Sequence, residues 1–250
     1  MIIIKSPREI ELMRQAGKVV GAVFDALKPL CKEGVTTLEL ANVAEQVITS
    51  FGAKPTFKGY GGFKGAICVS VNDEVVHGIP NKHRILQDGD IVSLDAGLIY
   101  KGYHSDAART YAVGNTSKEA QQLIDVTRQS FFEGIKYAKA GNRLHDISNA
   151  IAAYAESFGY GVVRDLVGHG IGTELHDDPQ IPNFKQLRRG IKLVPGMTLA
   201  IEPMINAGTW EVCWLDDEWT VVSEDGSLSA HYENTVLITD GEPEILTLKK

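Results

Sequence analysis

The sequence has few cysteines, no long apolar run and no excess of positive charge, and each shortage excludes a class of protein. Only three cysteines, Cys31, Cys68 and Cys213, occur among 250 residues. They are too few and too scattered for a disulfide framework or a cysteine-rich zinc site, so a reducing, cytosolic compartment is expected.

The absence of apolar runs and of a basic balance bears on membranes and nucleic acids. No stretch approaches the roughly 18 consecutive apolar residues that span a bilayer, and the run from Met1 to Ile4 is far too short for the core of a signal peptide. The formal net charge of −7 argues against duplex nucleic acid as the main ligand. We therefore expect a soluble cytoplasmic protein that binds neither DNA nor a membrane.

What is present is the composition of a globular protein with a substantial core, because 44% of the residues are apolar and 23% are charged. A chain of this length can form one domain or two. Since no low-complexity linker divides it, we expect a single domain over residues 1–250 that contains an internal repeat of about 1–115 and 116–250.

The repeat is visible as one pattern that recurs after 107 residues. The segment from Leu86 to Asp95 is answered by the segment from Leu193 to Glu202, and each consists of a turn glycine, a short apolar strand and a final acid. A duplication would place Asp95 and Glu202 at equivalent positions about a pseudo-twofold axis. Two buried acids that converge are costly unless a cation joins them, so the repeat predicts a metal site.

Each half is predicted to contain two helices followed by several short strands. Capping boxes at Ser6–Glu9 and Thr36–Glu39 begin the first two helices, and Thr116 is expected to cap the third. The expected helices end near Pro29, Gly52, Gly141 and Gly159, and the expected strands are Ala66–Val71, Ile91–Leu94, Thr110–Val113, Thr198–Ile201, Trp219–Val222 and Tyr232–Ile238. Clustered strands with tight turns favour antiparallel pairing in an α+β fold whose halves share one sheet.

Candidate metal ligands lie at the ends of these strands. A hairpin that turns at Tyr100-Lys101 would place Asp95 directly opposite Asp106, roughly 5 Å away, where the two charges repel unless a cation lies between them. The alternative is that one of these aspartates merely caps a turn.

Three further residues would complete an oxygen-rich set with one nitrogen. Glu202 ends a strand, Glu233 begins one, and His169 is flanked by the glycines of Gly168–Gly172. That glycine-rich segment could instead hold a phosphate, but no strand and helix surround it in the required order. Such a set suits Mn²⁺, Fe²⁺, Co²⁺ or Zn²⁺ and favours a two-metal site with bridging carboxylates.

Two more histidines, His77 and His176, lie beside glycine and proline turns that lead toward the acids. Loop histidines in such positions can take part in chemistry, and the alternative is that both are ordinary surface residues.

The ordered set Asp95, Asp106, His169, Glu202 and Glu233 resembles the dinuclear site of methionine aminopeptidases and their pita-bread relatives. Nearly the whole chain takes part in the resemblance, and by it the chain is identified as a member of the bacterial type I group of the M24 metallopeptidases. The motifs that carry it are Gly168–Gly172, Pro195–Thr198, Ile201–Asn206 and Leu228–Thr235. The resemblance implies the pita-bread fold of creatinases and aminopeptidases, in which two pseudo-twofold halves share a central antiparallel sheet flanked by helices.

The resemblance also implies a role for each residue. Asp95, Asp106 and Glu233 would hold one divalent metal, Asp106 and Glu233 would bridge to a second, and His169 and Glu202 would complete its site. Glu202 would also act as the general base. His176 would contact the scissile carbonyl, and His77 would reach the scissile amide nitrogen. The metals would be two ions of cobalt, manganese, iron or zinc.

The substrate implied by the resemblance is the N-terminus of a nascent polypeptide, whose methionine would be removed when the second residue is small. Tyr60, Phe63, Cys68 and Trp219 would line the methionine pocket. Phe57 and Leu175 would also reach the substrate, and here the sequence departs from the family. Phe57 stands where enterobacterial homologues have cysteine, and Leu175 stands where an aromatic residue or methionine is frequent. Simple packing is the alternative for Phe57 and Tyr60.

Rival functions within and outside this fold remain open at the sequence level. Residues 95–110 also resemble the first metal motif of Xaa-Pro peptidases, but those proteins carry a large N-terminal domain, and here the first helix begins at Ser6, so no such extension is expected. A non-catalytic peptide-binding module would lack metal ligands that this chain retains.

The expected oligomeric state is a monomer. The basic segment Lys185–Arg189 could dock transiently on a ribosome, although a solvated loop is the simpler interpretation.

Overall fold

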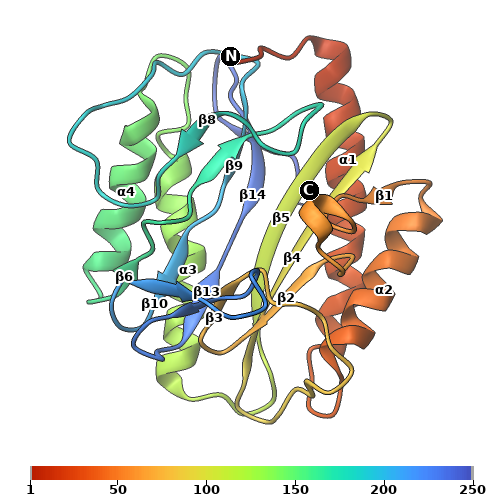
Figure 1. Cartoon of the computed structure of the whole chain (residues 1–250). Helices are drawn as coiled ribbons and strands as arrows, with labels where there is room; N and C mark the ends of the chain where they lie inside the picture. Colours follow the sequence, from red (N-terminus) through yellow and green to blue (C-terminus); the bar gives the residue numbers. More distant parts are fainter. Residues whose placement is uncertain (1, 249–250) are drawn as a thin grey trace.

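Two pairs of helices flank the strands in the computed structural model, which describes residues 2–248 (Figure 1). The first half contributes α1 (Pro7–Leu27) and α2 (Thr37–Ser50), and the second contributes α3 (Lys118–Ile135) and α4 (Leu144–Glu156). One apolar cluster packs α1 and α2 against the strands of the first half, and another packs α3 and α4 against the strands of the second. In the described part of the chain, no helix combines the length and apolarity that crossing a bilayer requires.

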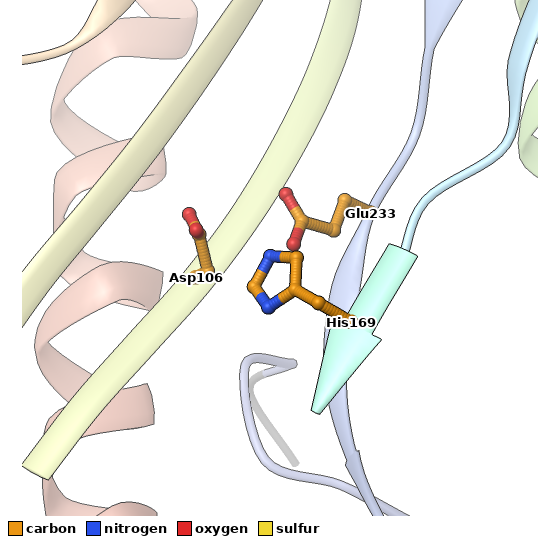
Figure 2. Close-up of side chains that lie close together, drawn as sticks. All are labelled: Asp106, His169 and Glu233. Carbon is orange, nitrogen blue, oxygen red and sulfur yellow. The ribbon is translucent and has the colours of Figure 1, made fainter. Parts of the chain in front are cut away.

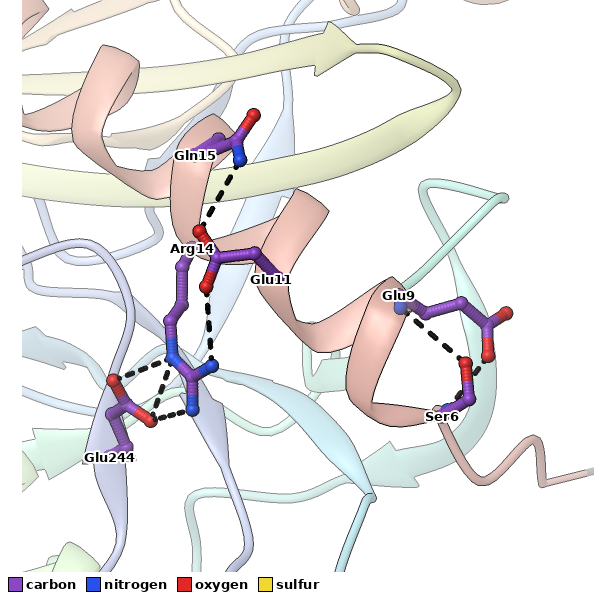
Figure 3. A network of polar contacts seen from close by, with 6 residues as sticks. All are labelled: Ser6, Glu9, Glu11, Arg14, Gln15 and Glu244. Atoms are coloured by element: carbon purple, nitrogen blue, oxygen red, sulfur yellow. Dashed lines mark hydrogen bonds and ion pairs between the residues drawn. The ribbon is translucent and has the colours of Figure 1, made fainter.

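The local signals at the helix starts are largely confirmed. Ser6 and Thr36 each form the predicted capping box with the glutamate three residues later, and Figure 3 shows the box at Ser6. The third helix is capped by Ser117, not Thr116, because the Ser117 hydroxyl accepts a hydrogen bond from the Ala120 N–H. That helix also ends at Ile135, earlier than Gly141, where the hydrogen bonds tighten to i→i+3 turns.

The strands pair antiparallel throughout the described residues, as predicted, but they divide among four small sheets. One sheet contains β1 (Lys54–Pro55), β2 (Cys68–Val71), β4 (Ile91–Tyr100) and β5 (Tyr103–Ala112), and another contains β7 (Gly168–Gly170), β8 (Asp177–Ile181), β9 (Thr198–Ile201), β14 (Asn234–Leu237) and β15 (Glu244–Ile245). The two smaller sheets contain β3 (Glu74–Val76), β6 (Gly161–Val162), β10 (Met204–Asn206), β11 (Val212–Trp214), β12 (Val221–Ser223) and β13 (Ser229–His231).

The two larger sheets meet at the centre of the molecule. There the backbones of Ala108 and Glu233 exchange two hydrogen bonds, of 3.0 and 3.3 Å. A central antiparallel arrangement flanked by helices is therefore present, and it is built from two abutting sheets. At the periphery, Arg14 of α1 forms an ion pair with Glu244 of β15 at 2.8 Å, which ties the first helix to the last strand (Figure 3).

The 107-residue repeat appears in the backbone hydrogen bonds. The N–H of Gly34 donates to the carbonyl of Leu86 at 2.9 Å, and the N–H of Gly141 donates to the carbonyl of Leu193 at 3.0 Å. Gly34 and Gly141 adopt φ values of 86° and 94°, which glycine accommodates without strain. The two halves therefore have equivalent backbone hydrogen bonds before Asp95 and Glu202.

The register predicted for the first hairpin is wrong, because each residue of β4 lies opposite a residue two positions further along β5 than predicted. The turn consists of Lys101 and Gly102, with φ of 51° and 86°, as in the two-residue hairpin turns whose twist matches that of the flanking strands. Asp95 therefore lies opposite Ala108, and Asp106 lies opposite Gly97. The two aspartates still share a face of the sheet, as diagonal neighbours rather than a directly opposed pair.

Beyond the hairpin the repeat continues at a different interval. The pair β10 and β13 corresponds to the far ends of β4 and β5, since Met204 lies opposite His231 as Gly97 lies opposite Asp106. In place of the two-residue turn, the second half has an excursion that contains β11 and β12, so the interval grows from 107 to 125 residues. The N–H of Gly89 donates to the carbonyl of Val113, and that of Gly196 donates to the carbonyl of Ile238. On this corrected interval, the counterpart of Asp106 is His231.

Several predicted strands have different bounds in the structure, since β2 begins only at Cys68 and both β4 and β5 extend to the hairpin turn. Trp219 precedes β12 in a turn, where the side chain of Asp217 accepts hydrogen bonds from the Trp219 and Thr220 N–H groups. The strand expected over Tyr232–Ile238 is β14, which begins only at Asn234, because the Tyr232 N–H donates to Pro203 while that of Glu233 donates to Ala108. The backbone thus changes partners next to Glu233.

Candidate metal centre and cavity

The five predicted metal ligands come from five separate segments and line one cavity of about 190 Å³. Asp95 lies on β4, Asp106 on β5 and His169 on β7, whereas Glu202 directly follows β9 and Glu233 directly precedes β14. Figure 2 shows the side chains of Asp106, His169 and Glu233 pointing toward a common space. The structure therefore brings together all the residues of the predicted set.

The distances among these side chains suit a shared cation. One ligand atom each from Asp106, His169 and Glu233 lies within 4.8 Å of the others, and all three residues are buried. His169 Nε2 lies 3.6 Å from Glu202 Oε1. One oxygen of each of Asp95, Asp106 and Glu233 is buried without a hydrogen-bond partner. Buried carboxylate oxygens without partners are costly unless a cation binds them.

The ionisation of the site supports the same interpretation. Burial and the neighbouring carboxylates hold the pKa of Asp95, Glu202 and Glu233 well above the ordinary carboxyl range. Burial also raises the pKa of Asp106 to about 7, against a hydrogen bond with Asp95 that lowers it. The negative charges therefore destabilise one another, and a divalent cation would reverse this effect.

His169 is prepared as a neutral ligand. Burial, and secondarily the nearby His176, lowers the pKa of His169 to about 4, so the ring is uncharged at neutral pH. Its Nδ1 lies 2.9 Å from the carbonyl oxygen of Gly170 and donates to it, which leaves the Nε2 lone pair free on the side of the acids. The donor set present thus fits a divalent metal.

The glycines around His169 serve close packing. A Cβ on Gly168 would lie 2.4 Å from the carbonyl oxygen of Ala200, and one on Gly170 would lie 2.1 Å from that of Asp178. These contacts let β7 fit between β8 and β9, where His169 pairs with Ala200. The segment is a buried strand, which argues against the phosphate-binding alternative.

Gly97 is a contributor that the sequence reasoning missed. A Cβ at this position would lie 2.7 Å from the Phe57 ring and 3.2 Å from Asp106 Oδ1. Gly97 therefore gives room to both a wall residue and a candidate ligand. Its place inside a strand, where glycine often marks close approach, was the available signal.

Apolar side chains form the cavity wall. All the residues predicted for the substrate pocket line it: Phe57, Tyr60, Phe63, Cys68, Leu175 and Trp219. Phe63 and Trp219 pack edge to face, with ring centroids 5.1 Å apart. The cavity is also lined by four apolar residues that were not predicted: Val76, Leu166, Val167 and Met204. From the sequence alone, such residues cannot be distinguished from residues of the hydrophobic core.

His77 and His176 also line the cavity. The ring of His176 packs 4.4 Å from that of His169, and its Nδ1 lies 2.9 Å from the hydroxyl of Tyr60. His77 has a φ of 60° and faces Trp219 with ring centroids 6.4 Å apart. Burial lowers the pKa of both histidines, so both are neutral near pH 7.

The chain also matches a known protein family and its curated members. Residues 11–240 match the model of metallopeptidase family M24. The chain is 59% identical to a methionine aminopeptidase of Clostridium acetobutylicum over 99% of both chains. It is 51% identical to methionine aminopeptidase 1 of Bacillus subtilis, again over 99% of both.

Solved structures extend the likeness to the fold. The methionine aminopeptidase of Thermotoga maritima superimposes with a TM-score of 0.98 at 48% identity, covering 100% of both chains. A prolidase from Pyrococcus furiosus has a TM-score of 0.79 at 24% identity, and the match covers 66% of that protein. The second likeness concerns the pita-bread fold alone. From the family match and these relatives, the chain belongs to the M24 metallopeptidases.

Proposed function

We propose that this protein is a metallo-aminopeptidase that removes the N-terminal methionine from nascent polypeptides and prefers a small second residue. The observation that carries the proposal is one cavity in which an apolar wall adjoins five candidate metal ligands. The relatives with 51–59% identity are methionine aminopeptidases, which supports the same activity. An apolar wall suits the methionine side chain, and the acids suit the metals that hydrolysis needs.

Two divalent ions would be held by residues from both halves. Asp95, Asp106 and Glu233 would bind one, and His169 and Glu202, together with the bridging Asp106 and Glu233, would bind the other. Cobalt, manganese, iron or zinc would suit this donor set. The bound metals would supply Lewis-acid polarisation and a nucleophilic water.

The side chains around the metals would carry the remaining steps. Glu202 would take up the proton of the attacking water as general base. His176 would donate from Nε2 to the scissile carbonyl oxygen when the Tyr60 hydroxyl donates to its Nδ1, because the hydrogen bond then fixes the tautomer. His77 would lie near the scissile amide nitrogen. Phe57, Phe63, Cys68, Leu175 and Trp219 would surround the methionine side chain.

A second candidate is an Xaa-Pro aminopeptidase or dipeptidase, since such proteins share the fold. A direct comparison of Met-Ala-Ser and Ala-Pro peptides, after treatment with EDTA and return of metal, distinguishes the two activities. We expect metal-dependent cleavage of Met-Ala-Ser. Cleavage of Ala-Pro in its place would overturn the proposal.

The cellular setting follows as part of the proposal. We place the protein in the cytoplasm as a monomer, where it would meet nascent chains and dock transiently at the ribosome through Lys185, Arg188 and Arg189. Leu187 at the centre of this segment is fully exposed, whereas Arg189 is held by an ion pair with Asp146 at 2.6 Å. Exchange of the three basic residues for glutamate should reduce co-sedimentation with ribosomes. Unchanged co-sedimentation would contradict the docking.

A further inference from the structure

His231 is a buried histidine with no role in the site described so far. It ends β13 and is 1% exposed, and its Nε2 has no hydrogen-bond partner among the described residues. That atom lies 3.5 Å from Glu202 Oε2, while His169 Nε2 lies 3.6 Å from Glu202 Oε1. The carboxylate of Glu202 therefore lies between two imidazoles, one for each of its oxygens.

The backbone of His231 is held in the same way as that of a candidate metal ligand. The Thr110 hydroxyl accepts from the His231 N–H at 2.9 Å and donates to its carbonyl at 2.9 Å. On the corrected interval of the repeat, Thr235 is the counterpart of Thr110. The Thr235 hydroxyl forms the same two bonds with Asp106, at 3.1 and 2.9 Å. The fold thus fixes His231 with a threonine clamp of the kind it uses for Asp106.

The clamp on His231 is itself supported. The Ser93 hydroxyl lies 2.8 Å from that of Thr110, and both hydroxyls are buried. An imidazole N–H at Nε2 needs an acceptor, and a carboxylate oxygen of Glu202 lies 3.5 Å away. A change of a few tenths of an ångström brings the pair into hydrogen-bond range.

We propose that His231 is a positioning residue that donates its Nε2 hydrogen to Oε2 of Glu202 and so holds Oε1 toward His169 and the metal site. The inference rests on the proposed role of Glu202. Metal-binding carboxylates are commonly oriented by such outer hydrogen bonds. The proposed role gives a chemical reason why the repeat counterpart of Asp106 is a polar residue, His231.

The test compares His231→Leu with His231→Gln, whose amide N–H can replace the donor. Mn²⁺ affinity of the apoprotein is measured by calorimetric titration, thermal unfolding of the same samples reports stability, and kcat and KM are measured with Met-Ala-Ser. We expect His231→Leu to lose roughly 10- to 100-fold in Mn²⁺ affinity or in kcat, with KM little changed. His231→Gln should recover most of the loss. His104→Leu is the control, because this half-buried histidine bonds Thr56 and does not line the cavity.

A double-mutant cycle with Glu202→Ala shows whether His231 acts through Glu202. In that background we expect His231→Leu to cause no further loss of Mn²⁺ affinity. The inference is overturned if His231→Leu behaves as the wild type, if His231→Gln falls as far as leucine, or if the loss persists without Glu202. Should His231→Leu fail to fold, the glutamine variant still tests the inference, because a large loss of Mn²⁺ affinity in folded His231→Gln would overturn it. Failure of the wild type to cleave Met-Ala-Ser would instead count against the proposed function, while the Mn²⁺ titrations still test His231.

Discussion

At the scale of single residues, the informative feature is a set of buried carboxylate oxygens that protein hydrogen bonds do not satisfy. Asp95, Asp106 and Glu233 each contribute one such atom at the same cavity. Aspartate and glutamate side chains are rarely fully buried unless they are paired. The mutual repulsion of these three carboxylates raises the free-energy cost of burying them further. Their presence together is understandable when the site is built to receive a cation.

Asp106 is the residue on which the metal site depends most, because it is proposed to bridge both ions. Asp106→Asn removes its negative charge while preserving its shape, so we expect Met-Ala-Ser turnover to fall below detection and Mn²⁺ affinity to fall with it. Asp125→Asn is a suitable control, since Asp125 is exposed on α3 and accepts a hydrogen bond from its helix neighbour Gln121. Persistent turnover in Asp106→Asn would show that the ligand assignment is wrong.

Tyr60 offers a finer test of the proposed role of His176. Tyr60→Phe keeps the ring but removes the hydroxyl that lies 2.9 Å from His176 Nδ1. One lost hydrogen bond predicts a decrease in kcat of roughly two- to tenfold, with KM nearly unchanged. Tyr100→Phe, at the end of β4 and outside the cavity, should leave steady-state kinetics unaffected. A change confined to KM would assign Tyr60 to substrate binding alone.

At the scale of elements, the sequence predicted what local chemistry determines and missed what depends on partners. The capping boxes at Ser6 and Thr36 act over three residues and were predicted correctly. The hairpin register was wrong because a turn centred on Tyr100-Lys101 and one centred on Lys101-Gly102 differ by one residue in sequence, and only the positive φ values distinguish them. The late start of β14, at Asn234, arises from contacts with Pro203 and Ala108 that are distant in sequence.

Two glycines of α1 test the packing of that helix. A Cβ on Gly17 would lie 2.1 Å from the carbonyl oxygen of Leu246, whereas one on Gly21 would meet nothing within 4 Å. Gly21→Ala should therefore raise the free energy of unfolding by about 0.5–1 kcal/mol through higher helix propensity. Gly17→Ala should lower it by about 1–3 kcal/mol through overpacking. Chemical denaturation measures both, and equal effects would contradict the close contact between α1 and the C-terminal segment.

At the scale of the whole molecule, the duplication accounts for where the site lies. The sequence indicated the repeat through Asp95 and Glu202, and the structure places both at one cavity beside the junction of the halves. The sequence could not reveal that the interval changes from 107 to 125 residues, because the excursion between β10 and β13 has no counterpart in the first half. His231 was overlooked for that reason, since its relation to Asp106 appears only when the strands are paired.

The junction between the halves also predicts how the chain unfolds. Reciprocal hydrogen bonds join Ala108 to Glu233, and the Arg109 side chain bonds Asn234 at 2.6 Å and packs over Tyr232 at 4.4 Å. We therefore propose that residues 1–250 form one cooperative unit. All three tryptophans belong to the second half, and Trp219 packs on Phe63 of the first. Their fluorescence therefore reports the second half and its junction, while far-ultraviolet circular dichroism reports helices of both. The two denaturation curves should coincide, and separated midpoints would indicate halves that unfold independently.

The central claim is that residues from both halves hold two metal ions in this cavity. Anomalous diffraction from crystals grown with Mn²⁺ tests it most directly, because it locates the ions without reference to activity. We predict two anomalous peaks, one among Asp95, Asp106 and Glu233 and the other beside His169 and Glu202, with Asp106 and Glu233 contacting both. Peaks found only outside the cavity, or none at all in an enzyme that Mn²⁺ activates, would contradict the account.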